Sequence, residues 1–144
     1  AVTANSGAQD LVVIVNQLNI AGKKASSYNA FDTAQASAEI VAPLIMDRNS
    51  GFYTGVQIMN VGDTATTVTC TFTNAAGDVS KTYTTPSLVK NQADTHLQLN
   101  FLANGFVGSA TCKSADANGK LIGVVNELGS GAGDQLFSYE GFNK

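Results

Sequence analysis

The single histidine of the chain is the first residue to test for catalysis, because an imidazole can act as a general base at neutral pH. His96 lies in the segment 92–97, with Asp94 two residues before it. A carboxylate at that spacing could orient the ring, but the segment contains neither a nucleophile nor a second ligand. We therefore interpret His96 as an exposed strand histidine. We expect no catalytic residues and no enzyme.

Two other segments resemble ligand-binding loops in part. Asp47–Gly51 begins like a calcium loop but lacks the later bidentate glutamate, which favours a turn between strands. Gly129–Gly133 is rich in glycine, but it lacks the Lys-Ser/Thr ending of a phosphate loop, so a hairpin loop is the better interpretation. The carboxylates are scattered and form no pair suited to glycoside hydrolysis. We expect neither a metal nor a cofactor.

The two cysteines have a clearer role. Cys70 alternates with Val68 and Phe72 on one face of a predicted strand, and Cys112 shares a face with Ala110, so both sulfurs should point inward. With one histidine they are too few for a structural zinc site. The sequence starts without an initiator Met, as a cleaved secretory signal or simple trimming would leave it. In an exported chain this pair favours a disulfide over two buried free thiols.

Composition and charge argue against two classes of partner. Charged residues make up 13% of the 144 residues, and the formal net charge is −3. Nucleic-acid binding needs a cluster of cationic residues, so we expect no nucleic-acid partner. The longest apolar run, Leu11–Val15, is far shorter than the roughly 18 residues that span a bilayer. Aromatic residues are few and Trp is absent, which gives little support to a glycan-binding platform, and contact with a glycan or a cell surface stays open.

Short segments separated by Asn, Gly, Asp and Pro predict an all-β sandwich of antiparallel strands. The turn-forming runs Asn74–Asp78 and Asp116–Lys120 each predict a hairpin turn. Only Thr33–Ala38 has a helical or linker-like composition. We predict strands at 10–18, 25–31, 39–46, 52–60, 65–74, 78–85, 94–101, 106–114, 120–127 and 135–142.

Side-chain patterns predict which strand faces are buried. Between Thr64 and Asn74 threonines alternate with apolar residues, so one face should be wet and the other should face the core. In contrast, Leu11–Val15 and Leu121–Val125 are apolar on both faces. We therefore expect both of these strands to be covered on both sides.

The strongest feature of the sequence is an internal repeat, because residues 10–32 duplicate residues 120–143. The segment 11–18 aligns without gaps on 121–128, and 27–32 aligns on 138–143 after a loop that differs by one residue. The shared pattern is L-x-x-x-V-N-x-L, a loop, and S-Y-x-x-F. Repeats of this kind must be recognised before a fold is assigned.

Each copy predicts a hairpin, and a lone hairpin is marginally stable in water, so each must join a sheet. Two interpretations stay open. Both copies can join one sandwich, or the N-terminal copy can leave it and add a strand to a neighbouring subunit. In the second case the contact is heterologous and propagates into a filament. The predicted donor-strand residues are Leu11, Val12, Val13, Ile14, Val15, Leu18, Tyr28 and Phe31.

A further set of segments carries a family resemblance: 42–46, 51–62, 105–110 and 124–127, together with the S-Y-E-G-F motif at 138–142. Through them residues 39–143 resemble an immunoglobulin-like repeat module of bacterial cell-surface proteins. The resemblance implies an immunoglobulin-like antiparallel β-sandwich at 39–144, after an N-terminal segment at 1–38 that holds the candidate donor strand and a linker. Within that segment, residues 10–32 look like the tail of an earlier module. The resemblance also implies a structural or adhesive surface role without catalytic residues.

Two functional hypotheses follow from the sequence. The first is a secreted structural subunit of a pilus-like appendage on the cell surface, which pairs with copies of itself by donating its N-terminal strand. The second is an adhesive or ligand-binding surface module that folds its N-terminal hairpin onto its own sandwich.

Overall fold

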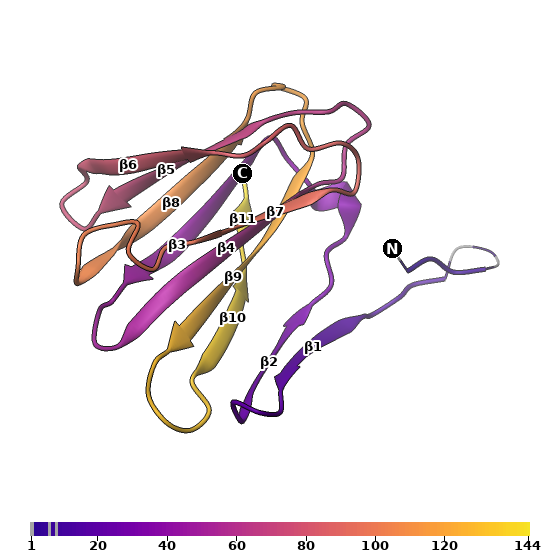
Figure 1. Cartoon of the computed structure of the whole chain (residues 1–144). Coiled ribbons are helices and arrows are strands. Elements are labelled where there is room, and N and C mark those ends of the chain that lie inside the picture. Colours follow the sequence, from indigo (N-terminus) through magenta and orange to yellow (C-terminus); the bar gives the residue numbers. More distant parts are fainter. Residues whose placement is uncertain (1, 6, 8) are drawn as a thin grey trace.

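The computed structural model describes residues 2–5, 7 and 9–144. Within them the chain forms antiparallel strands and one short 3₁₀ turn, η1, at Thr33–Gln35 (Figure 1). The strands are β1 Ile14–Asn19, β2 Lys24–Asn29, β3 Glu39–Asp47, β4 Phe52–Asn60, β5 Val68–Asn74, β6 Val79–Thr84, β7 Ala93–Leu97, β8 Phe106–Ser114, β9 Leu121–Gly129, β10 Leu136–Glu140 and β11 Phe142–Asn143. No helix in this described part is long and apolar enough to cross a membrane.

Strands β3 to β11 form two sheets that pack face to face. One sheet has the order β10-β9-β4-β7 and the other has the order β11-β3-β8-β5-β6. The β1–β2 hairpin is a separate two-stranded sheet beside β10 (Figure 1). The prediction of an all-β antiparallel sandwich is confirmed.

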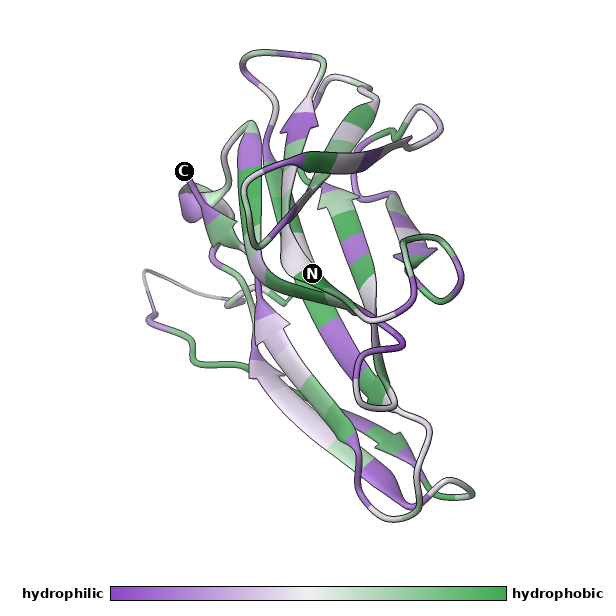
Figure 2. Cartoon of the chain, turned by 90° about the vertical axis from the view of Figure 1, so that its left-hand side faces the viewer, coloured by the Kyte–Doolittle hydropathy of each residue, from purple (hydrophilic) through white to green (hydrophobic). Residues whose placement is uncertain are grey.

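The core lies between the two sheets and follows the period-two alternation of the strands (Figure 2). In β5 the residues Val68, Cys70 and Phe72 are buried, while Thr69 between them is exposed, as the alternation predicts. The inner faces contribute a continuous apolar cluster whose largest members are Phe72, Ile45, Leu88, Leu121, Val68 and Val125.

The predicted disulfide joins Cys70 to Cys112. The two residues lie directly opposite each other on the paired strands β5 and β8, so the bond links neighbours within one sheet. Both side chains are buried in the core. The bond is compatible with an oxidising, extracellular environment.

Every predicted strand is present, with several differences in extent. The strand predicted at 65–74 starts at Val68, the one predicted at 94–101 ends at Leu97, and the one predicted at 135–142 is divided into β10 and β11. The first strand starts at Ile14, although the apolar pattern predicts a start at residue 10. Its partner β2 ends at Asn29, so residues 10–13 have no strand opposite them, and the pairing ends with a hydrogen bond from Ala30 N to Val13 O.

The two predicted hairpin turns have different outcomes. Asn74–Asp78 does join the paired strands β5 and β6, and Asn74 Oδ1 accepts hydrogen bonds from the backbone of Ala76 and Asp78. The prediction for Asp116–Lys120 is wrong, because this turn carries the chain from β8 in one sheet to β9 in the other. Turn composition does not determine whether the flanking strands pair with each other, since that depends on distant partners.

Candidate functional site

The two copies of the repeat fold as two hairpins with the same register. Val15 lies opposite Tyr28 in the N-terminal hairpin, and the equivalent Val125 lies opposite Tyr139 in the C-terminal hairpin. The equivalent asparagines also face equivalent serines in both copies. The sequence repeat is therefore a repeat of structure.

The C-terminal copy, β9–β10, is built into the sandwich. β9 lies between β10 and β4, and Leu121 and Val125 are fully buried in the core. The Tyr139 hydroxyl donates to the backbone carbonyl of Leu44 in the opposite sheet and accepts from Leu44 N at 3.3 Å. Burial raises the pKa of Tyr139 to about 12. As predicted, the strand at Leu121–Val125 is covered on both sides.

The N-terminal copy lies over the outer face of the C-terminal copy. Because successive side chains alternate and Val125 points into the core, Val124 and Asn126 point outward. On this face Asn126 Oδ1 accepts hydrogen bonds from Gln17 Nε2 at 3.2 Å and from Ser138 Oγ at 2.6 Å. Val124 is only 6% exposed, although it points away from the core. The β1–β2 hairpin therefore has an inner face that covers the β9–β10 hairpin.

Two carboxylates bind the edge of β2. Asp134 Oδ1 accepts from Ala25 N at 3.0 Å, and Glu140 Oε1 accepts from Asn29 N at 2.8 Å. At the loop end, the Lys24 ammonium donates to the carbonyl of Gly129. Among the described residues no backbone ladder joins β2 to β10. Side chains, and not sheet pairing, therefore hold the hairpin. We call this surface of β9–β10, with Asn126, Gly129, Asp134 and Glu140, the seat.

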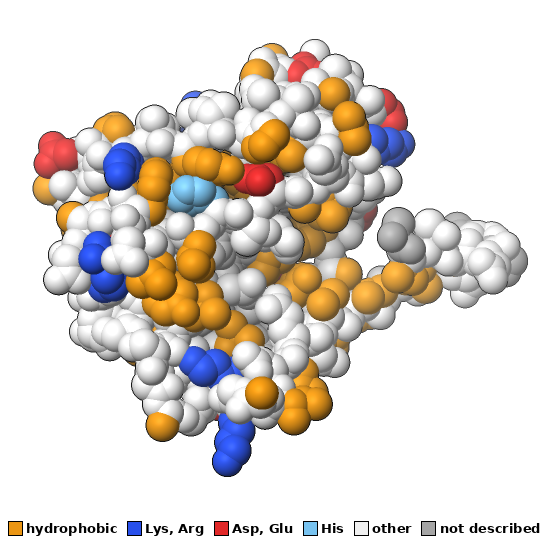
Figure 3. All heavy atoms as spheres, viewed as in Figure 1, with side chains coloured by type: hydrophobic (Ala, Val, Ile, Leu, Met, Phe, Trp, Pro, Cys, Tyr) orange, Lys and Arg blue, Asp and Glu red, His pale blue; other side chains and the backbone are white. Residues whose placement is uncertain are grey.

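The opposite, outer face of the N-terminal hairpin is apolar and uncovered. Val12 is 91% exposed, Ile14 60% and Leu18 70%. Figure 3 shows apolar side chains along this segment as it leaves the body of the molecule. The equivalent positions of the C-terminal copy, Ile122, Val124 and Leu128, are partly or fully buried. The prediction that Leu11–Val15 is covered on both sides is therefore wrong for this chain alone.

The predicted donor-strand residues divide between the two faces. Val13, Val15 and Tyr28 are half-buried on the inner face, and Phe31 after the hairpin is also half-buried. The exposed members are Leu11, Val12, Ile14 and Leu18. The sequence analysis did not predict the four residues of the seat, which accept the hydrogen bonds of the hairpin. Only the duplication itself pointed to the C-terminal hairpin.

The histidine lies in an aromatic cluster and not on an exposed strand face, so that interpretation was wrong. Its ring centroid is 3.8 Å from that of Tyr83 and 4.4 Å from that of Phe101. Burial lowers the pKa of His96, against the opposing charge of Asp94. The Tyr83 hydroxyl donates to Asp94 at 2.7 Å, and this bond raises the pKa of Tyr83 to about 12. The cluster fills the space between β6 and β7, the neighbouring edges of the two sheets.

The calcium-like segment has a structural role. Asp47 is fully buried, and its carboxylate accepts hydrogen bonds from Leu102 N at 2.8 Å, Asn100 N at 3.2 Å and Arg48 Nε at 2.8 Å. Residues 48–51 form the predicted turn between β3 and β4. Across residues 2–5, 7 and 9–144, no three His, Cys, Asp or Glu side chains gather as a metal site would require.

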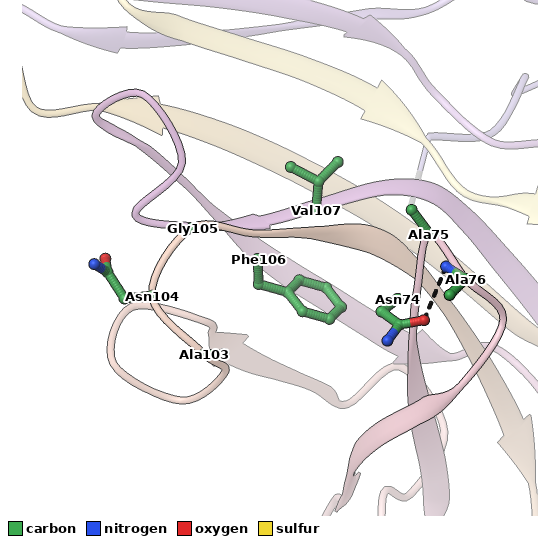
Figure 4. A pocket seen from close by; sticks show the side chains of 8 residues that line it. All are labelled: Asn74, Ala75, Ala76, Ala103, Asn104, Gly105, Phe106 and Val107. Atoms are coloured by element: carbon green, nitrogen blue, oxygen red, sulfur yellow. Dashed lines mark hydrogen bonds between the residues drawn. The ribbon is translucent and has the colours of Figure 1, made fainter.

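Two hollows lie on the described part of the surface, and their linings assemble no catalytic grouping. One, of about 440 Å³, lies between the β5–β6 turn and the start of β8 (Figure 4). Its lining combines small residues with the side chains of Asn74, Asn104 and Phe106. Its polar contact in Figure 4 is the turn bond from Ala76 N to Asn74 Oδ1. A second hollow, near Asp63, contains the ion pair Lys90–Asp63 at 2.6 Å. The β1–β2 hairpin and its seat are therefore the candidate functional site.

Comparisons with known proteins bear on the fold alone. The sequence matches no protein-family profile and no curated protein. A solved structure that the fold resembles is the crystal structure of Thermotoga maritima 1070, with a TM-score of 0.58 and 14% sequence identity over 76% of this chain and 96% of that chain. At this identity the likeness supports the sandwich and carries no information on activity or partners.

Proposed function

We propose that this protein is a structural subunit of an extracellular, pilus-like filament and that it polymerises by donating its N-terminal hairpin to a neighbouring copy. The observation that carries the proposal is the exposed apolar face of that hairpin, at positions that are covered in its own duplicate. A single chain leaves this face in water. A second copy can cover it.

The energetics favour association. Full burial of one large aliphatic side chain is worth about 1.5–3 kcal/mol. Val12, Ile14 and Leu18 are all more than half exposed, and so is Ile20 in the following turn, at 80%. A flat apolar strand of this kind is an aggregation hazard unless a partner covers it. Because the donated hairpin and the surface that receives it are different parts of the molecule, the contact is heterologous and extends into a filament.

The buried disulfide supports the extracellular assignment, because such bonds persist in oxidising compartments. The resemblance of residues 39–143 to surface modules points in the same direction.

The test is the variant Ile14→Lys/Leu18→Lys, which places two charges on the outer face without touching the inner one. We expect it to remain folded and monomeric, while the unchanged protein forms large species in sedimentation velocity and filaments in electron microscopy. The matched control is Val79→Lys, because Val79 on β6 is 63% exposed and lies outside the hairpin. Filaments of normal length from the double variant would contradict the proposal.

A second candidate function is an adhesive or ligand-binding module that keeps its hairpin on its own sandwich. The hydrogen bonds from Ala25 and Asn29 to the seat within one chain favour it. Size-exclusion chromatography at rising concentration distinguishes the two candidates. A self-contained module stays monomeric, whereas a donor subunit forms large species.

A further inference from the structure

The contact between hairpin and seat does not depend on chain connectivity. Its polar bonds run from the Gln17 and Lys24 side chains and from two backbone N–H groups of β2 to acceptors on β9, β10 and their loop. No backbone ladder continues across it in the described residues. The hairpin of a second copy can therefore make the same contact with the same groups.

The segment between hairpin and sandwich is suited to such an exchange. The hydrogen bonds of the segment 30–36 are local, from Ala30 back to Val13 and within the turn that Asp32 caps. The sandwich begins to hold the chain at Ser37, which bridges to Leu121. Eight residue steps separate Asn29 from Ser37, and fully extended they span about 26–29 Å.

Charge also matches donor to acceptor. The tip of the hairpin carries Lys23 and Lys24, whereas the seat carries Asp134 and Glu140. In the single chain the two carboxylates bind β2 backbone N–H groups, and Lys24 reaches the adjacent carbonyl of Gly129. A cationic hairpin tip and an anionic seat favour the heterologous contact over the pairing of two identical surfaces.

From these contacts we infer that the acceptor for the donated hairpin is the seat on β9–β10 of a neighbouring copy. The inference rests on the proposed function and adds the surface that receives the hairpin. Each copy gives its hairpin to one neighbour and takes a hairpin from the other, so the exchange is open-ended. The inner face of the donated hairpin then lies on the seat of the acceptor copy, at the junction of two bodies.

The test uses two variants that each add one cysteine to the disulfide-bonded chain, Ala25→Cys and Asp134→Cys, because Ala25 N lies 3.0 Å from the Asp134 carboxylate. The two are mixed, allowed to assemble and oxidised with glutathione disulfide. A covalent dimer that requires both variants is expected, since neither molecule alone carries both thiols. The double variant, held dilute as a monomer, gives an internal bridge and shows that the geometry permits the bond. A mixture of Ala25→Cys with Val79→Cys is the negative control.

The outcomes separate the two proposals. Filaments without the mixed dimer would overturn the seat as acceptor and leave the filament proposal standing. No large species under any condition would overturn both.

A second readout is the variant Asp134→Ala/Glu140→Ala, which removes both carboxylates of the seat. We expect the concentration needed for assembly to rise at least about tenfold, because two hydrogen bonds to charged acceptors are lost. The matched control is Asp78→Ala, a carboxylate in the β5–β6 turn. Unchanged assembly by the double variant would overturn the inference.

Discussion

At the scale of single residues, the cysteine pair stabilises the sandwich by a covalent link between two strands. Cys70 and Cys112 are buried partners on adjacent strands, and the bond closes a loop with a sequence separation of 42. A closed loop of this length reduces the entropy of the unfolded chain by an amount equivalent to about 4 kcal/mol in the chain-entropy description.

The double variant Cys70→Ala/Cys112→Ala should lose about 4 kcal/mol of unfolding free energy. The measurement is urea denaturation of the variant and of the unchanged protein, each with and without reductant. Reductant should destabilise only the unchanged protein. Equal midpoints for the variant and the unchanged protein, both without reductant, would show that the bond does not contribute to stability.

His96 is a second residue whose environment determines its behaviour. Its Nδ1 lies 3.0 Å from Gln98 Nε2, which donates to it when the ring is neutral. Burial lowers its pKa from the ordinary 6.5. Since the unfolded chain then binds a proton more readily than the folded one, stability falls as the pH drops through 6.5 toward the lower pKa of the folded state.

The variant His96→Phe should abolish this loss while keeping the ring packing with Tyr83 and Phe101. Burial raises the pKa of Glu127, and this makes the stability rise as the pH falls, opposite to the effect of His96. The protein with His96 and the His96→Phe variant are therefore both compared in a Glu127→Gln background. Thermal unfolding is followed from neutral pH downward through 6.5, the ordinary histidine pKa. Parallel Tm profiles in the two proteins would exclude His96 as the cause.

At the scale of elements, one hairpin pattern occurs in two environments. The copies share register, but only the C-terminal copy continues into a strand, β11, that pairs with β3. Its tyrosine is bonded to the opposite sheet, whereas the described residues include no such bond for Tyr28. The surrounding sheets, not the hairpin sequence, determine how each copy is used.

The equivalent tyrosines give a matched pair of variants. Tyr139→Phe should cost about 1 kcal/mol, because the hydrogen bond to Leu44 is lost. Tyr28→Phe should change stability by less than about half of that, within the range of neutral surface substitutions. Chemical denaturation of both measures the difference, and equal losses would contradict the assignment of different roles.

At the scale of the whole molecule, the sandwich of β3–β11 has its own core, and the N-terminal hairpin lies outside it. The described core cluster contains no residue of the β1–β2 hairpin. Removing the hairpin should therefore leave the core of the sandwich intact.

Deletion of residues 1–32 should leave a folded, disulfide-bonded monomer that cannot assemble. Circular dichroism and sedimentation velocity check the fold and the mass. The truncated protein should also bind a synthetic peptide of residues 9–32. Because the chain contains no Trp, calorimetry and light scattering are suitable ways to measure this binding. An unfolded product would show that the hairpin is part of the fold, and filaments without it would exclude its donation.

The sequence by itself determined what depends on local pattern. Alternation placed the strands and the inward cysteines, because side chains change face at every residue, and the duplicated motif identified the hairpin copies. Tertiary structure alone decided which strands pair, that β8 and β9 lie in different sheets, and that Val12 and Ile14 are left in water. It also placed Asp134 and Glu140 against β2. The bonds of Asp134 and Glu140 to β2 join residues more than one hundred positions apart, and the sheets pair strands that are not consecutive in the chain. A period of two carries no information about such partners.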